Sequence, residues 1–243
     1  MATTAAAIPR RAVPRRLYVG LALLTAAIAV VGFWPTYFGP LVAGTVDKVP
    51  IIHFHAAVYV GWLALFMTQA ALAATGRVAS HMKLGQFAIG YGVLVIAVGL
   101  ITAFARFALR VRAGEVAAAN AQLLGPILDM LVFAPFFAAA VYYRRKPEPH
   151  KRLMVVATTS LLIAAVARMP FLGEPRNQLL LHSIWVAPIL LAMAHDFWRH
   201  RKVHAVYLLG LVVLVLEGPL VRQPARVSEA WQNMAGWLAT WMA

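Results

Sequence analysis

Two histidines and one aspartate occupy matching positions in three apolar stretches of the chain. His55 and His182 each precede a Gly or Pro by six residues, and Asp129 precedes Pro135 in the same way. Imidazole and carboxylate groups on separate rigid helices are the donors that zinc, non-haem iron and copper accept. The sequence therefore predicts a site for Zn, Fe or Cu formed by His55, Asp129 and His182.

Haem b is the second cofactor that these residues predict. His55 and His182 would flank the haem plane if their helices present them at the same depth. Gly85, Gly92 and Gly99 repeat every seven residues, which gives one helix face either a smooth surface for a porphyrin or a close contact with another helix. The chain has no cysteine, so a c-type haem bound through thioethers, disulfides and thiol catalysis are excluded.

Three residues on the helix of His55 extend the predicted site. His53 is a further candidate ligand, although residues two apart on a helix point in roughly opposite directions. Trp62 and Gln69 lie on the same helical stripe as His55. An aromatic stripe that ends in an amide suits either a flat lipid-soluble ligand or ordinary core packing.

The same polar residues also allow a purely structural interpretation. An Asp inside a membrane span costs roughly 2.5 to 3.5 kcal/mol on insertion scales, so Asp129 is expected to face a partner. A hydrogen-bonded clasp between Asp129 and Arg168 on neighbouring helices would supply one. Glu217 and Arg222 are predicted to pair near the end of the last span, or to form a proton or substrate path to the triad. If the triad binds a metal or haem, Arg168 and Glu217 are expected to lie around its ligand residues without contacting the cofactor.

The elements that must position these residues are membrane-spanning helices. Of the 243 residues, 62% are hydrophobic and 12% are charged, and the mean hydropathy is +0.76. Soluble domains are much more polar, and the chain has no room for a separate soluble domain. We therefore predict one all-α polytopic bundle, with seven spans at 17 to 38, 51 to 74, 85 to 108, 123 to 143, 153 to 172, 179 to 198 and 204 to 221.

An internal repeat organises six of these spans into three helical hairpins that follow one added helix. Each hairpin carries a histidine in its basic turn, namely His81, His150 and His204. His200 and His204 have the i, i+4 spacing of a metal site, but their basic neighbours favour contact with lipid headgroups instead. Residues 226 to 243 are predicted to form an amphipathic helix on the outer interface.

The turn sequences of the repeat carry a resemblance to known proteins. Ser80-His81-Met82-Lys83-Leu84 and Pro149-His150-Lys151-Arg152-Leu153 resemble the His-Lys/Arg-Leu turns of an uncharacterised family of bacterial multi-pass membrane proteins. The resemblance covers most of residues 50 to 222, and no established activity is attached to that family. It implies a location in the bacterial cytoplasmic membrane.

The distribution of charge predicts the orientation and the partners of the bundle. Fourteen of the 22 Lys and Arg residues fall on the side of the N-terminus, which the positive-inside rule places in the cytoplasm, and the C-terminus then lies outside. The formal net charge of +14 thus predicts contact with anionic lipids at the inner face. Nucleic acid is excluded as a partner because the chain has no soluble basic module or stacking motif.

Three functions follow from these observations. The first is an integral membrane protein whose outer-leaflet His/Asp pocket binds a metal ion or haem in a redox or metal-handling role. The second is a transporter or channel that uses the same polar cluster as a substrate or proton path. The third is a non-catalytic accessory subunit that assembles with another membrane protein or with further copies of itself.

Overall fold

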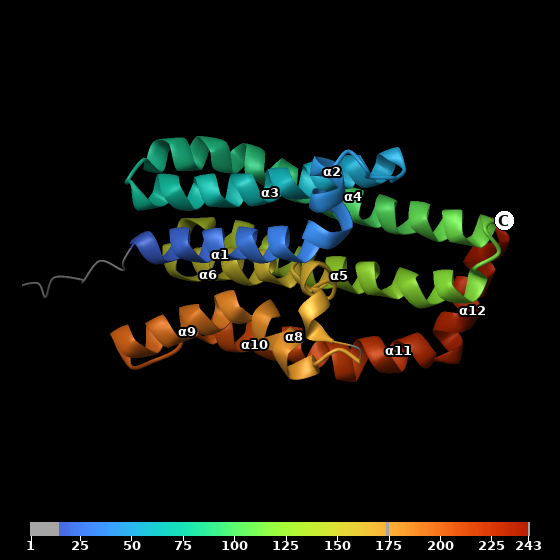
Figure 1. The fold of residues 1–243 in the computed structure, drawn as a ribbon. Coiled ribbons are helices and arrows are strands. Elements are labelled where there is room, and N and C mark those ends of the chain that lie inside the picture. The colour runs from blue at the N-terminus through green and yellow to red at the C-terminus, as the bar shows by residue number, and fades with distance from the viewer. Residues whose placement is uncertain (1–14, 174, 243) are drawn as a thin grey trace, which may run out of the picture.

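The computed structural model describes residues 15–173 and 175–242. Within these ranges the chain is helical and contains no β-strand, which confirms the predicted all-α class. Long antiparallel helices lie side by side, and a short helix crosses their ends (Figure 1). The fold is therefore a helical bundle with an end cap.

The first half of the bundle is built from long helices. Pro50 occupies the first turn of its helix, where a missing N–H costs no hydrogen bond. The elements are α1 (Arg15–Phe33), the π-helical η1 (Trp34–Phe38), α2 (Gly39–Val42), α3 (Pro50–Ala74), α4 (Val78–Arg112) and α5 (Val116–Tyr142).

The second half is repeatedly interrupted. One break separates α8 from α9, which meet at an angle of 63°. Pro188 lies in the first turn of α9 and has no N–H, so α8 cannot continue regularly through it. The elements are η2 (Tyr143–Arg145), α6 (Pro147–Ser160), α7 (Ile163–Val166), η3 (Pro170–Leu172), α8 (Gln178–Trp185), α9 (Ala187–His200), α10 (Ala205–Glu217), η4 (Gly218–Arg222), α11 (Gln223–Val227) and α12 (Glu229–Thr240).

The number of spans is lower than the sequence predicts. Among the described residues, five helices are long and apolar enough to cross a bilayer, and α8 with α9 adds a sixth if the bent pair is one span. The predicted span at 153 to 172 falls on α6, α7 and η3, which are short and separated by turns. The molecule is thus consistent with a helical membrane bundle, but the seven-span count and the hairpin repeat are not confirmed.

One pair of helices is longer than a bilayer requires. At 1.5 Å per residue the 35 residues of α4 extend about 52 Å, against roughly 30 Å for the hydrocarbon core of a membrane. The far ends of α4 and α5 project beyond α1, α3 and α8, with α11 alongside them, and α12 lies across these ends (Figure 1). The indole Nε1 of Trp231 in α12 donates to the backbone oxygen of Asn120 in α5 at 3.1 Å.

The C-terminal helix differs from the single interfacial helix predicted for 226 to 243, whose last residue lies outside the described ranges. Ser228 separates α11 from α12 and caps the second helix by accepting from the N–H of Trp231 at 3.2 Å. Trp231 is buried against the protein, whereas Val227 and Trp241 are exposed, so the predicted apolar stripe is divided between two environments. Only the exposed part is available to a lipid surface.

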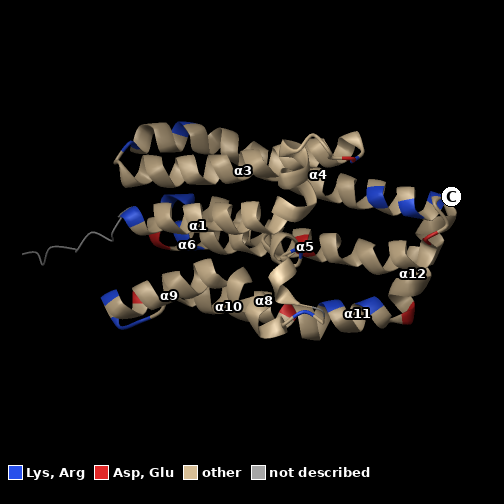
Figure 2. Ribbon diagram, viewed as in Figure 1, with Lys and Arg blue, Asp and Glu red and all other residues tan. Residues whose placement is uncertain are grey.

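Charged residues concentrate at the two ends of the bundle (Figure 2). The turns that follow α3, α5 and α9 lie at the same end as the start of α1, at the left of Figure 1. Arg10 and Arg11 of the predicted basic N-terminal segment lie outside the described residues. The long middle section is apolar apart from a few charged groups, which are therefore expected to be paired.

Close packing of α1 on α7 depends on a glycine. A Cβ at position 32 would lie far inside van der Waals contact with the backbone oxygen of Ala165, which belongs to α7 and cannot move as a flexible side chain can. Gly20 on the same helix has nothing within 4 Å of the corresponding position. The two glycines therefore differ only in what surrounds them.

We expect Gly32→Ala to destabilise the bundle by about 1 to 3 kcal/mol, because the added methyl group forces α1 and α7 apart. Thermal unfolding of the detergent-solubilised protein measures this effect. Gly20→Ala is the matched control and should leave the midpoint unchanged or raise it, since Ala stabilises an exposed helix relative to Gly. Equal midpoints for the two variants would contradict the packing described here.

Candidate functional site

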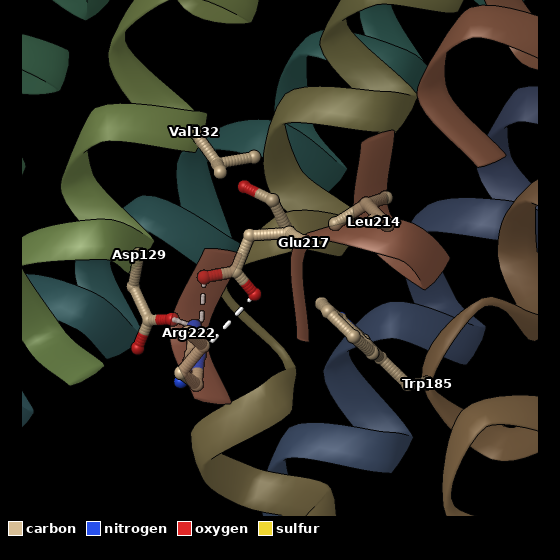
Figure 3. Close-up of a pocket in the computed structure, with 7 residues that line it drawn as sticks. Asp129, Val132, Trp185, Leu214, Glu217 and Arg222 are labelled. Atoms are coloured by element: carbon tan, nitrogen blue, oxygen red, sulfur yellow. Dashed lines mark hydrogen bonds and ion pairs between the residues drawn. The ribbon is translucent and has the colours of Figure 1, made fainter. Parts of the chain in front are cut away.

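Three ionisable side chains meet inside the bundle and form what we call the Asp129 cluster: Asp129, Glu217 and Arg222. Arg222 donates through Nη2 to Oδ1 of Asp129 at 2.6 Å. Its Nε donates to both carboxylate oxygens of Glu217, at 3.1 and 3.2 Å. Figure 3 shows Asp129 of α5 and Glu217 of α10 converging on this guanidinium. The pairing of Glu217 with Arg222 that the sequence predicts is confirmed.

Irregular backbone places these groups. Pro219 follows the end of α10 and has no N–H, and the chain there forms the π-helical turn η4 that ends at Arg222. Asp129 lies between two prolines inside α5, Pro126 and Pro135. Short π-helical segments occur frequently at functional sites, and intramembrane ionisable groups are functional candidates by default.

A small cavity adjoins the Asp129 cluster. Its volume is about 10 Å³, which is close to the space that one water molecule requires. Besides the three ionisable groups it is lined by Val132, Ser160, Trp185 and Leu214. Polar and apolar side chains thus line a site that is about the size of one water molecule.

Ser160 of this cavity belongs to a run of three buried hydroxyl residues at the end of α6. Thr158, Thr159 and Ser160 are all at most 2% exposed. The helix breaks after Ser160, and the indole Nε1 of Trp185 donates at 3.0 Å to the backbone oxygen of Thr159. The side-chain oxygens of Thr158 and Thr159 are buried without a hydrogen-bond partner in the structure. These hydroxyl groups are available to hydrogen-bond a water molecule, including one that carries a transferred proton.

A second ion cluster lies at the other end of α6, which we call the Arg152 cluster: Glu148, Arg152 and Asp196. Arg152 is 3% exposed and donates to both oxygens of Asp196, through Nε at 3.1 Å and Nη2 at 2.9 Å. It also donates to Glu148, one helical turn before it. Burial acts to raise the pKa of Glu148, but hydrogen bonds from Lys151 and Arg152 outweigh that effect and lower the pKa overall.

Two tyrosines border the Arg152 cluster. The Arg152 guanidinium lies over the ring of Tyr207 at 5.6 Å, and the hydroxyl groups of Tyr207 and Tyr18 are 3.3 Å apart. Sequence reasoning did not identify this group. The available indication was that Asp196 falls within a predicted span and Arg152 at the edge of another, which requires a partner for each.

The structure does not bring the predicted metal ligands together. Asp129 is engaged by Arg222, and the ring of His55 stacks on Tyr59 at 4.1 Å with its Nδ1 buried and unpartnered. Nδ1 of His182 donates to the backbone oxygen of Gln178 at 2.7 Å. Across residues 15–173 and 175–242, no group of three or more His, Asp or Glu side chains could hold a metal ion.

The other residues of the predicted pocket pack or bond locally. Nδ1 of His53 lies 3.0 Å from the hydroxyl of Tyr37. Trp62 is buried edge-on against Phe133 at 5.6 Å, which is core packing. The side-chain oxygen of Gln69 is buried without a partner.

The glycine stripe on α4 is used for helix packing rather than left open for a porphyrin. The ring of Phe137 lies against Gly92, and Tyr59 and Met130 lie against Gly99. Close approach of neighbouring helices is the usual role of such a stripe.

The predicted clasp between Asp129 and Arg168 is wrong, because Asp129 pairs with Arg222. The N–H of Arg168 bonds to Ala165, which leaves the backbone oxygen of Ala164 free at the end of α7. The Arg168 guanidinium donates to that oxygen and lies over the ring of Phe33 at 5.0 Å. Arg168 therefore bonds to the backbone of its own turn and leaves the ion pair with Asp129 to Arg222.

Comparison with known proteins identifies no relative: no family model, no curated protein and no solved structure matches the chain. The function must therefore be argued from the site itself.

We expect Arg222→Met to destabilise the protein by about 3 to 5 kcal/mol, because it leaves the buried carboxylate of Glu217 and the half-buried one of Asp129 without their cation. The measurement is again the thermal unfolding midpoint in detergent. Arg77→Met, at an exposed turn position, is the control and should have little effect. A small effect at position 222 would mean that the Asp129 cluster is solvated rather than buried.

Proposed function

We propose that the protein is a transporter or channel that conducts protons across the membrane, with the Asp129 cluster as its proton-binding site. The observation that carries this proposal is the placement of two carboxylates on one guanidinium inside an apolar bundle. This is the transport function that the sequence offered as an alternative.

The charge balance of the Asp129 cluster favours reversible protonation. With all three groups ionised the cluster carries one net negative charge, and burial penalises that charge. One proton on Asp129 or Glu217 removes this net charge and weakens one of the two ion pairs with Arg222. The cluster can therefore alternate between a charged, doubly bonded state and a neutral state with one carboxyl released.

A single face of α10 connects the two ion clusters. Tyr207, Gly210, Leu214 and Glu217 are the buried residues of this helix. Tyr207 adjoins the Arg152 cluster and Glu217 belongs to the Asp129 cluster, about 15 Å apart at 1.5 Å per residue. At the Asp129 cluster, the hydroxyl residue Ser160 lines the cavity and supplies a polar group that a proton path can use.

Interrupted helices support the same interpretation. Transporters commonly form their binding sites from discontinuous spans, and α6 with α7 and α8 with α9 are interrupted beside the cavity. We propose that these two pairs each complete a crossing, which gives the seven-span, three-hairpin arrangement. We also propose a cytoplasmic N-terminus in a bacterial inner membrane, with the basic turns in contact with anionic lipids.

The metal function is not proposed further, because Arg222 already satisfies Asp129 and competes with any bound cation. Haem is not proposed either, because aromatic and methionine side chains fill the glycine face of α4 that it would need.

Proton flux into proteoliposomes tests the proposal. A potassium diffusion potential set by valinomycin drives the flux, and a pH-sensitive dye inside the vesicles reports it. Wild-type protein should acidify the lumen well above protein-free vesicles, and Asp129→Asn should reduce the rate at least about tenfold, since it removes a titratable group from the path. Asp47→Asn, at an exposed loop position, should retain the rate.

Two results would contradict the proposal. One is a wild-type rate no higher than that of empty vesicles. The other is a rate that Asp129→Asn leaves unchanged while the variant remains folded.

A further inference from the structure

Two histidines that the proposed proton path does not use occupy the same place in successive hairpins. His81 is the fourth residue of α4 and His150 is the fourth residue of α6. Both rings lie at the end of the bundle where the hairpins turn, and both are partly exposed. Their ring centroids are 6.4 Å apart and their planes are nearly perpendicular.

Hydrogen bonds to backbone oxygens fix the tautomer of each ring. Nδ1 of His81 lies 3.2 Å from the backbone oxygen of Gln69, and Nδ1 of His150 lies 2.8 Å from that of Ala140. A carbonyl oxygen can only accept, so Nδ1 carries the proton in both rings. The lone pair is then on Nε2, which is the arrangement that metal-binding histidines adopt when a carbonyl orients them.

The spacing of the rings fits one shared metal ion. Two imidazoles bound through Nε2 at roughly 2.0 Å place their ring centroids about 5 to 6.4 Å apart, and the upper end corresponds to a nearly linear N–metal–N angle. We propose that His81 and His150 together bind one transition-metal cation, copper(I) in particular, through their Nε2 atoms. Water or a small external ligand would complete any further coordination.

The charge of the surroundings favours copper(I) over a divalent ion. Lys83 and Lys151 lie one or two residues from the two histidines, and their repulsion is half as strong for a single positive charge as for a double one.

His200 and His204 form an i, i+4 pair at the same end of the bundle, but His204 has the opposite tautomer. Nδ1 of His204 accepts from the N–H of Val206 at 3.2 Å, so the proton of its neutral ring is on Nε2. Metal binding through that nitrogen would require His204 to give up the hydrogen bond that caps α10. His200 is therefore left without its i+4 partner as a second ligand, and it serves as the control residue.

Anaerobic titration of the purified, tag-free protein with copper(I), in competition with a chromophoric chelator, tests the site. We expect one equivalent to bind, with the affinity reduced at least about tenfold in both His81→Ala and His150→Ala and unchanged in His200→Ala. Thermal unfolding of each variant establishes that the fold is retained. X-ray absorption of the wild-type complex should show nitrogen or oxygen ligands and no sulfur.

Three outcomes would overturn this proposal, and none depends on proton flux. The first is the absence of stoichiometric copper(I) binding by the wild type. The second is undiminished binding in both folded histidine variants. The third applies if those variants fail to fold. Sulfur scattering in the X-ray absorption spectrum of the wild type would then assign the metal to methionine instead of histidine.

Discussion

A buried charge in an apolar bundle must have a partner, and the second half of this molecule is arranged around that requirement. Arg222 reaches two carboxylates only because the backbone leaves α-helical geometry after Glu217. Arg152 reaches Asp196 from the first turns of α6, and both groups are almost fully buried. Each cluster joins helices that are distant in the sequence. The buried charges therefore find their partners only when these helices pack together.

The sequence predicts the helices well where apolar runs are long and uninterrupted. The helix α3 coincides almost residue for residue with the expected 51 to 74, whereas α4 and α5 continue beyond the apolar runs because polar residues can extend a helix into water. Breaks at Leu161 and Val186 were not predicted. At Leu161 the indole of Trp185 bonds to the backbone oxygen of Thr159, a tertiary contact that the sequence does not reveal. At Val186 the break is explained by Pro188, which lies in the middle of the predicted span.

The identity of Asp129's partner shows the limit of pattern reasoning. Arg168 and Arg222 each follow a turn histidine by 18 residues, so the repeat makes them equivalent candidates. Only the three-dimensional course of the chain distinguishes them, because Arg168 is held by an oxygen that its own broken turn exposes. The histidines illustrate the same point, since their sequence positions are alike while the hydrogen bonds at Nδ1 assign opposite tautomers to His150 and His204.

The breaks in the helices are distributed unequally between two parts of the molecule. The helices α3, α4 and α5 are continuous rods, and α12 braces the far ends of α4 and α5. From α6 to α10 the chain has joints at Leu161, Val186 and Gly218, where a few backbone dihedral angles can absorb a change of direction. The continuous helices α3, α4 and α5 thus lie beside the interrupted elements α6 to α10, and the ion pairs of the Asp129 cluster connect the two parts.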